Sequence, residues 1–511
     1  MEPADFLTIL GLVLAVWAII PSKERRYLLL FFSNRELYSL GIGIVFIHYL
    51  MAFDWLRGNW LPFLSIVSFP EGVPANIWAY LVSLFLISYP VLKVSFGYYS
   101  SARGNNLLAL YNTYLKENEI DLLVRLIDKY HAVDIVKYLE AKAGLPKEKQ
   151  FFYQKKATDD RPFERLMSAK RIRFAAIVYG HIIQNKTFIR LAANKYPDVF
   201  AKAFAGMESP AVANKELIEL FIECLFEAKN QAFVDELKLI EGSLSSIKRF
   251  EEEDNSLPIL SSLLTHTKTA VENYVWRPVG EGAIRSLKND SVQRQYLLRD
   301  YDSDIKPQLW DCKIYIATVY FNYMVRETIY RDSQWHMWLF YYQDFVRELI
   351  TLIPRGVSYD PDSPYPLFAH YLINELFSIM DGWLNLAKNQ NVDYRVIDTI
   401  RCTGRCIHLL CQAGSDVITI KLKQQQFDRL LHTYFEFAFH SSNIGATTTR
   451  KWLRKMFLFP NGVDLGIPYT TIEYRSALLD AWRSFDKVPY ASYNDSLVQE
   501  FENDILMTLG L

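Results

Sequence analysis

The densest group of potential metal ligands in this chain is a set of three cysteines and one histidine: Cys402, Cys406, His408 and Cys411. Thiolate and imidazole groups are the usual zinc ligands in proteins. On a helix, however, only Cys402 and Cys406 would share a face, because successive residues turn by about 100°. The group also contains no C-x-x-C pair. We therefore interpret these cysteines as buried structural residues and expect no metal and no cofactor.

A second candidate site is formed by Arg331 and His336, in the segment RDSQWH. An imidazole near a guanidinium suits RNA cleavage, with acid–base chemistry at a 2′-hydroxyl and charge stabilisation of the phosphorane. The spacing resembles the R-[N/H/D]-x-x-x-H motif of HEPN ribonucleases, over these few residues. That resemblance implies a helical bundle in which Arg331 and His336 cut RNA at a dimer cleft. The alternative is that both belong to an aromatic helix face beside Trp335 and Trp338.

The remaining chemical motifs give little support for an enzyme. Four aspartates have the relative spacing of calcium ligands in an EF-hand loop: Asp300, Asp302, Asp304 and Asp311. Ile305 stands where such a loop needs Gly, and Asp311 replaces the usual bidentate Glu. We interpret the segment as a solvated turn with helix caps. Gly280 and Gly282 lack the third glycine of a phosphate loop, and the common hydrolase, NTPase and metalloprotease motifs do not occur.

Three apolar stretches near the N-terminus predict where the protein works: Phe6–Ile20, Leu37–Phe53 and Ile77–Val94. The second and third are long enough to cross a hydrocarbon core of about 30 Å, and the first is long enough when the residues that lead into it, Met1–Asp5, are included. We therefore expect transmembrane helices at about 5–21, 37–53 and 77–96, within a membrane domain of residues 1–104. The first stretch has no basic start and no small-residue cleavage site, so we expect a retained anchor and not a cleaved signal peptide.

The loop charges predict the orientation of these spans. The basic residues between the first two are Lys23, Arg25, Arg26 and Arg35, whereas Arg57 is the only one between the second and third. The positive-inside rule then places the N-terminus outside and the C-terminal region in the cytoplasm, as an integral membrane protein. Three tryptophans would lie at the outer membrane interface: Trp55, Trp60 and Trp78.

Several residues within the spans favour contacts between membrane helices. Gly41 and Gly43 would let another helix approach closely, and a neutral His48 would be tolerated if it faced a partner helix. Pro90 could kink the third span. Lys93 lies near its end, where it could reach the headgroups. These features make self-association into a homo-oligomer plausible.

From residue 105 onward the apolar spacing is helical, and strands are hard to find, so an all-α fold follows. We expect two cytoplasmic domains, 105–255 and an aromatic-rich 256–511, divided near the acidic segment RFEEEDN. Short turns between helices of moderate length suit a solenoid- or bundle-like stack. The net charge is −1, so electrostatics does not predict DNA or RNA as a partner.

The sequence as a whole favours a non-catalytic function. We expect a membrane-anchored binding or sensor protein that is held in the lipid bilayer and recognises a protein partner or signal through its cytoplasmic helices. One alternative is a membrane-perturbing or pore-forming effector of a bacterial antiviral or self-killing system. Another is a membrane-tethered HEPN-like ribonuclease. A small transporter or channel fits least well, because the spans are few and carry little charge.

Overall fold

The computed structural model describes residues 18–30, 32–59, 74–95, 104–127, 185–197, 215–242, 257–264, 274–301, 308–331, 337–357, 359–360, 363–387, 394–439, 444–460, 470–491 and 495–511, with the single positions 11, 15 and 270. In these ranges the regular structure is helical, and the only β-type pairing is an isolated bridge between Asp300 and Leu367. The predicted all-α class is confirmed.

The chain divides into two compact units. The first comprises Met1–Ala141 and Leu145–Phe188, and the second comprises Lys142–Gly144 and Ile189–Leu511. Helix α10 (Lys186–Lys195) contains the change from one unit to the other. The domain boundaries expected at residues 104 and 255 stay predictions.

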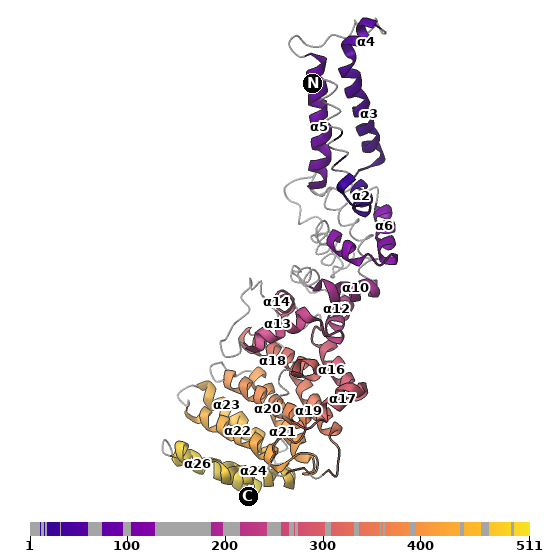
Figure 1. The fold of residues 1–511 in the computed structure, drawn as a ribbon. Helices are drawn as coiled ribbons and strands as arrows, with labels where there is room; N and C mark the ends of the chain where they lie inside the picture. Colours follow the sequence, from indigo (N-terminus) through magenta and orange to yellow (C-terminus); the bar gives the residue numbers. More distant parts are fainter. Residues whose placement is uncertain are drawn as a thin grey trace, which may run out of the picture. The chain divides into compact units, whose positions relative to one another are not determined.

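The first unit is built around two long apolar helices, α3 (Asn34–Met51) and α5 (Ala75–Ser95), which lie side by side (Figure 1). Before α3 comes α2 (Ser22–Leu29), and α4 (Phe53–Asn59) follows it after a bend of 60°. Helix α6 (Gly104–Lys116) and a helical segment at 120–127 come after α5. The structure thus contains a helical hairpin at the place of the second and third predicted spans.

Fewer membrane spans are supported than the sequence predicted. In the described part of the chain, α5 is long and apolar enough to cross a membrane over Ala75–Lys93. The bent pair α3 and α4 passes the same test when it is taken as one span. The first predicted span lies mostly outside the described residues. One or two helices of this chain could therefore span a membrane, and the three predicted spans are not confirmed.

The second unit is a succession of helices joined by turns. In chain order they are α12 (Lys215–Glu227), α13 (Gln231–Gly242), α14 (Pro258–Leu264), α16 (Arg277–Asn289), α17 (Ser291–Leu297), α18 (Lys313–Arg331), α19 (Phe340–Leu352), α20 (Phe368–Ala387), α21 (Tyr394–Gln412), α22 (Ile420–Phe439), α23 (Ile444–Leu458), α24 (Ile472–Ser484), α25 (Val488–Ala491), α26 (Asp495–Phe501), a π-helical turn (Glu502–Leu506) and α27 (Met507–Leu509).

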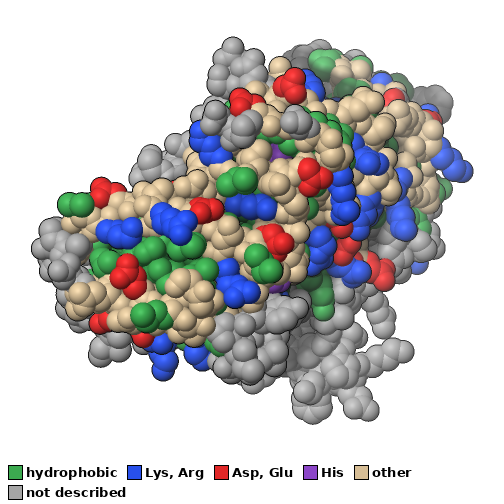
Figure 2. Space-filling view, turned by 90° about the horizontal axis from the view of Figure 1, so that it is seen from below, with side chains coloured by type: hydrophobic (Ala, Val, Ile, Leu, Met, Phe, Trp, Pro, Cys, Tyr) green, Lys and Arg blue, Asp and Glu red, His purple; other side chains and the backbone are tan. Residues whose placement is uncertain are grey.

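These helices stack in two rows. Helices α16, α18, α20, α22 and α24 contact one another in succession, and α19, α21 and α23 form a second row against them (Figure 1). Alternate helices are therefore neighbours, as in stacked helical hairpins. Apolar side chains gather over the last helices of the chain, among charged ones (Figure 2). The exposed large apolar residues of these helices include Ile472, Val488 and Met507.

Helices α12 and α13 form a hairpin within a segment whose apolar spacing alone predicts one helix. The segment 216–240 reads as continuous, but it breaks at Lys229, which has a φ of +47°. The next residue, Asn230, begins α13 by accepting a hydrogen bond from Phe233 N (3.2 Å). Its side-chain amide also donates to Asn194 O (2.8 Å), near the end of α10. A single amide therefore satisfies polar groups at two helix ends, which stabilises the break.

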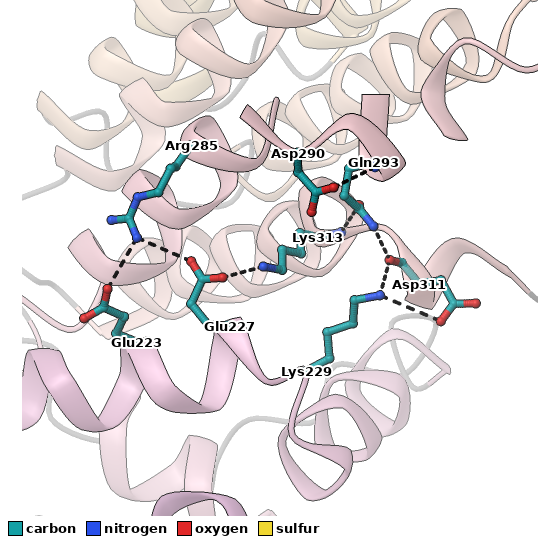
Figure 3. A network of polar contacts seen from close by, with 8 residues as sticks. All are labelled: Glu223, Glu227, Lys229, Arg285, Asp290, Gln293, Asp311 and Lys313. Carbon is teal, nitrogen blue, oxygen red and sulfur yellow. Dashed lines mark hydrogen bonds and ion pairs between the residues drawn. The ribbon is translucent and has the colours of Figure 1, made fainter. Parts of the chain in front are cut away.

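A network of charges joins α12 to the helices packed on it (Figure 3). Arg285 of α16 lies 3.4 Å from Glu223 and 3.6 Å from Glu227. Glu227 also binds the ammonium group of Lys313, at the start of α18. Lys229 donates to the backbone oxygen of Asp311 at 2.6 Å. The network ties the ends of three helices together at one edge of the stack.

Gly280 and Gly282 serve helix packing in α16. A Cβ atom on Gly280 would come within 2.3 Å of Tyr341 Cε1, in α19. The Tyr341 ring cannot retreat easily, because it is stacked on Phe321 (5.2 Å) and also contacts Trp276 (5.8 Å). Gly282 faces α12 instead, where a Cβ atom would come within 2.9 Å of Phe226 Cδ1. The two glycines thus allow α16 to approach α19 and α12 closely.

We predict that Gly280→Ala destabilises the second unit by about 1–3 kcal/mol, because the added methyl group overlaps a fixed ring. Thermal unfolding followed by circular dichroism measures the effect. Gly382→Ala is the matched control, since its Cβ would meet only Arg326 Nη2 at an ordinary 3.7 Å. The control should be neutral or raise the melting temperature, as Ala is the better helix former. Equal melting temperatures for both variants would contradict the prediction.

Candidate functional site

The hairpin of α3 and α5 is held by close apolar packing. Its buried centre is formed by Ile47, Leu50 and Ala79, with Met51, Val82 and Leu86 packed against them. Gly43 lies at this contact, where a Cβ atom would come within 2.8 Å of Leu86 Cδ1. A Cβ atom on Gly41 would meet nothing within 4 Å, so Gly41 lies on the outside of the hairpin.

One end of the hairpin is closed by a polar cluster centred on Glu36. The Glu36 carboxylate binds the ammonium group of Lys93 and accepts a hydrogen bond from Tyr89 Oη at 2.5 Å. Its other oxygen accepts from Ser33 N at 2.7 Å, and Ser33 Oγ accepts from Glu36 N at 3.2 Å. This reciprocal capping box begins α3. Glu36 therefore fixes the start of α3 and the end of α5 at once.

Lys93 is largely enclosed by this cluster. Its side chain is 13% exposed, and its ammonium group lies 5.3 Å from the Phe32 ring and 5.7 Å from the Tyr89 ring. Both distances allow cation–π attraction. The side chain thus turns inward to Glu36 and to aromatic rings. The expectation that Lys93 reaches the lipid headgroups stays a prediction.

The basic residues expected at the membrane surface gather at this same end. Arg25 and Arg26 lie on α2, just before the hairpin, and the exposed Arg35 lies in the first turn of α3. Arg25 Nε is buried and has no hydrogen-bond acceptor in the described part of the structure. The side chain of Lys23 lies outside the described residues.

Helix α2 connects this end of the hairpin to α6. The Tyr27 ring is buried and stacks on Tyr111 of α6, with 6.2 Å between the ring centres. Nearby, burial raises the pKa of Tyr114 to about 12, although the positive charge of Arg26 opposes the shift. Helix α2, which carries Arg25 and Arg26, is therefore packed against α6 through the Tyr27 ring.

The other end of the hairpin carries tryptophans. Trp55 lies on α4 and Trp78 lies in the first turn of α5, and both are exposed. Phe53 and Ala75 pack together between them. Trp60 lies outside the described residues. The basic cluster and the tryptophans are thus at opposite ends.

Two further residues singled out from the sequence lie within the hairpin helices. The ring of His48 is exposed on α3, with Nδ1 3.0 Å from Ile44 O. Pro90 lies inside α5, which continues to Ser95. The roles in helix association assigned to Gly41, His48 and Pro90 stay predictions.

The candidate ribonuclease pair is not placed by the structure. Arg331 is the last residue of α18, but its side chain and the whole of His336 lie outside the described residues. The aromatic segment 314–353 divides there into two helices, α18 and α19, and many of their side chains are buried. Asp302 and Asp304 of the aspartate motif also lie outside the described residues. Asp311 is engaged by Lys229 in the network of Figure 3.

The cysteines and the histidine of α21 are buried. Cys402 Sγ donates to Leu339 O at 3.2 Å, and Gln412 contacts His408 Nε2 at 3.0 Å. Burial raises the pKa of Cys406 well above its usual value and that of Cys411 to about 12, so both thiols stay protonated. No group of three or more metal-ligating side chains occurs in the described residues.

A second candidate site joins residues that are distant in the sequence. A small cleft of about 120 Å³ lies between α21 and α23, with Trp452 at its mouth beside Arg401 and Lys455. The segment RKWLRK around Trp452 is a visible signal, because an aromatic residue stands among four basic ones. Arg401 could not be joined to it from the sequence, since α22 separates the two helices along the chain.

Comparisons with protein-family models, with curated proteins and with solved structures found no match to this chain.

We predict that Glu36→Leu opens the hairpin more than Lys93→Leu does. Loss of the carboxylate leaves an enclosed ammonium group without its counter-charge, which costs roughly 3 kcal/mol. Loss of the ammonium group leaves Glu36 bonded to Ser33 and Tyr89, so the cost is smaller. The double variant should recover much of the loss. Hydrogen exchange of the α3 and α5 amides in lipid nanodiscs measures the opening. Exchange at the wild-type rate in all three variants would contradict this role.

Proposed function

We propose that this chain is a membrane-anchored helical binding protein, whose hairpin lies in a lipid bilayer and whose second unit recognises a protein partner. The observation that carries the proposal is the outer surface of the hairpin. Ile42 of α3 is 69% exposed and Phe85 of α5 is 66% exposed, among other large apolar side chains on both helices. A contiguous apolar surface of this kind marks a membrane or protein interaction site.

The different residue types at the two ends of the hairpin support one orientation of the hairpin in the membrane. The end with Glu36 and Lys93 also carries Arg25, Arg26 and Arg35, and positive charge is retained on the cytoplasmic side. Trp55 and Trp78 suit the opposite interface. The second unit would then lie in the cytoplasm, where the surfaces of stacked helices are suited to binding proteins. Gly41, on the outside of α3, leaves room for a second copy of the hairpin in the bilayer.

We predict that Val45→Glu with Phe85→Glu releases the protein from membranes, because an acidic side chain at the centre of a span costs about 2.5–3.5 kcal/mol. Retention after alkaline carbonate extraction measures the anchoring. The matched control is Ile472→Glu with Val488→Glu, which alters equally exposed apolar residues of the second unit. The control should stay with the membrane. Extraction of the wild-type chain by carbonate would overturn the proposed anchor.

The bend between α3 and α4 favours a second candidate function, a membrane-perturbing effector. An interrupted span with a separable ion pair at one end could rearrange and disturb the bilayer. Dye release from liposomes that carry the full chain separates the two functions. For the anchor we expect liposomes that remain tight with the wild type and with Glu36→Leu. Leakage that increases in Glu36→Leu would favour the effector.

A further inference from the structure

The cleft between α21 and α23 has an apolar floor. The floor is formed by Ile400 of α21, by Met456 of α23, and by Phe459 and Pro460 just after α23. Gly404 allows this arrangement, since a Cβ atom there would come within 2.7 Å of Met456 Cγ and 3.1 Å of Pro460 O. The missing side chain lets the end of α23 lie directly on α21. The floor is therefore a product of close helix packing.

The mouth of the cleft gathers positive charge around one aromatic ring. The Arg401 guanidinium lies 5.5 Å from the centre of the Trp452 ring, and Lys455 Nζ lies 5.0 Å from it. Both are within cation–π distance. Arg401 also pairs with Asp398, three residues earlier, at 3.3 Å. An exposed pair of this kind contributes little and does not use all five N–H donors of the guanidinium.

On the side of α23 that faces the C-terminal helices, two arginines are paired with acidic residues. Arg450 lies 3.5 Å from Glu500, and Arg454 lies 2.6 Å from Asp504, both from the C-terminal helices. The basic residues that line the cleft itself are Arg401 of α21 and Lys455 of α23, and the exposed Lys451 precedes Lys455 by one helical turn. Two helices thus present basic residues to the same cleft, so its surroundings attract negative charge.

We propose that this cleft binds an acidic peptide segment of the protein partner. An apolar side chain of the segment would lie on the floor, and the neighbouring carboxylate would lie between Arg401 and Lys455. The combination of an apolar floor with two cations at one mouth favours such a segment over a simple anion, which would leave the floor unused. The inference rests on the proposed binding function and names its partner class and its site.

Fluorescence anisotropy with the full chain in nanodiscs of neutral lipid tests the proposal. The probe is a fluorescein-labelled peptide of alternating Glu and Leu, and its matched counterpart carries Gln in place of Glu. We expect the Glu peptide to bind at least roughly tenfold more tightly than the Gln peptide, because the Gln peptide lacks one charge-assisted contact. Arg401→Glu with Lys455→Glu should weaken it by a further factor of roughly ten or more. The control, Arg483→Glu, changes an exposed arginine of α24 and should leave the affinity unchanged.

The outcomes separate this inference from the anchor. Failure of the wild-type chain to bind the Glu peptide, or equal binding by the cleft variant, overturns the cleft assignment and leaves membrane retention untouched. Full displacement of the Glu peptide by inorganic phosphate, with equal binding of a peptide that carries Ser in place of Leu, would assign the cleft to a simple anion and overturn the peptide. Loss of membrane retention with intact peptide binding would overturn the anchor alone. Melting temperatures of all variants confirm that they are folded.

Discussion

The carboxylate of Glu36 meets two structural needs at the point where the chain enters the apolar hairpin. One oxygen accepts from Ser33 N and so begins α3, while the other binds Tyr89 and Lys93 near the end of α5. A helix end in an apolar setting must satisfy its backbone donors, and a buried ammonium group needs a counter-charge. Because one side chain supplies both, the two helices have a fixed register. Gly43 and Leu86 can then meet further along the contact.

The sequence predicted those parts of the fold that depend on local pattern. The stretch Ile77–Val94 became α5 (Ala75–Ser95) because a long uncharged run has few alternatives to a helix. The all-α class followed from spacing alone. The break at Lys229 was missed, since the capping role of Asn230 depends on a backbone oxygen in α10. Gly280 and Gly282 were compared with a nucleotide-binding motif, whereas Gly280 makes room for the Tyr341 ring of α19 and Gly282 makes room for the Phe226 ring of α12.

In the candidate sites, too, the features that depend on local pattern could be predicted and the contacts between distant residues could not. The basic residues before α3 and the tryptophans beyond it were named from residue type alone, because membrane interfaces select residue types and not exact partners. The structure places them at opposite ends of the hairpin, and their membrane role stays a proposal. The pairing of Glu36 with Lys93, and of Arg401 with Trp452, joins residues that are distant in the chain. Such contacts depend on which helices become neighbours. In this chain alternate helices are neighbours, so the intervening helix hides the pair from any local pattern.

All five cysteines of the chain are buried in the second unit, with free thiols. Burial raises the pKa of Cys312 to about 11 and leaves the thiol protonated and inaccessible. The folded chain therefore has no thiol with which to sense oxidants or to form a disulfide with another copy. A thiol reagent can react with a cysteine only when the helices around that cysteine open, and the cysteines are spread along the stack from α12 to α21. The native cysteines thus give the unmodified protein its own set of probes for local unfolding along the stack.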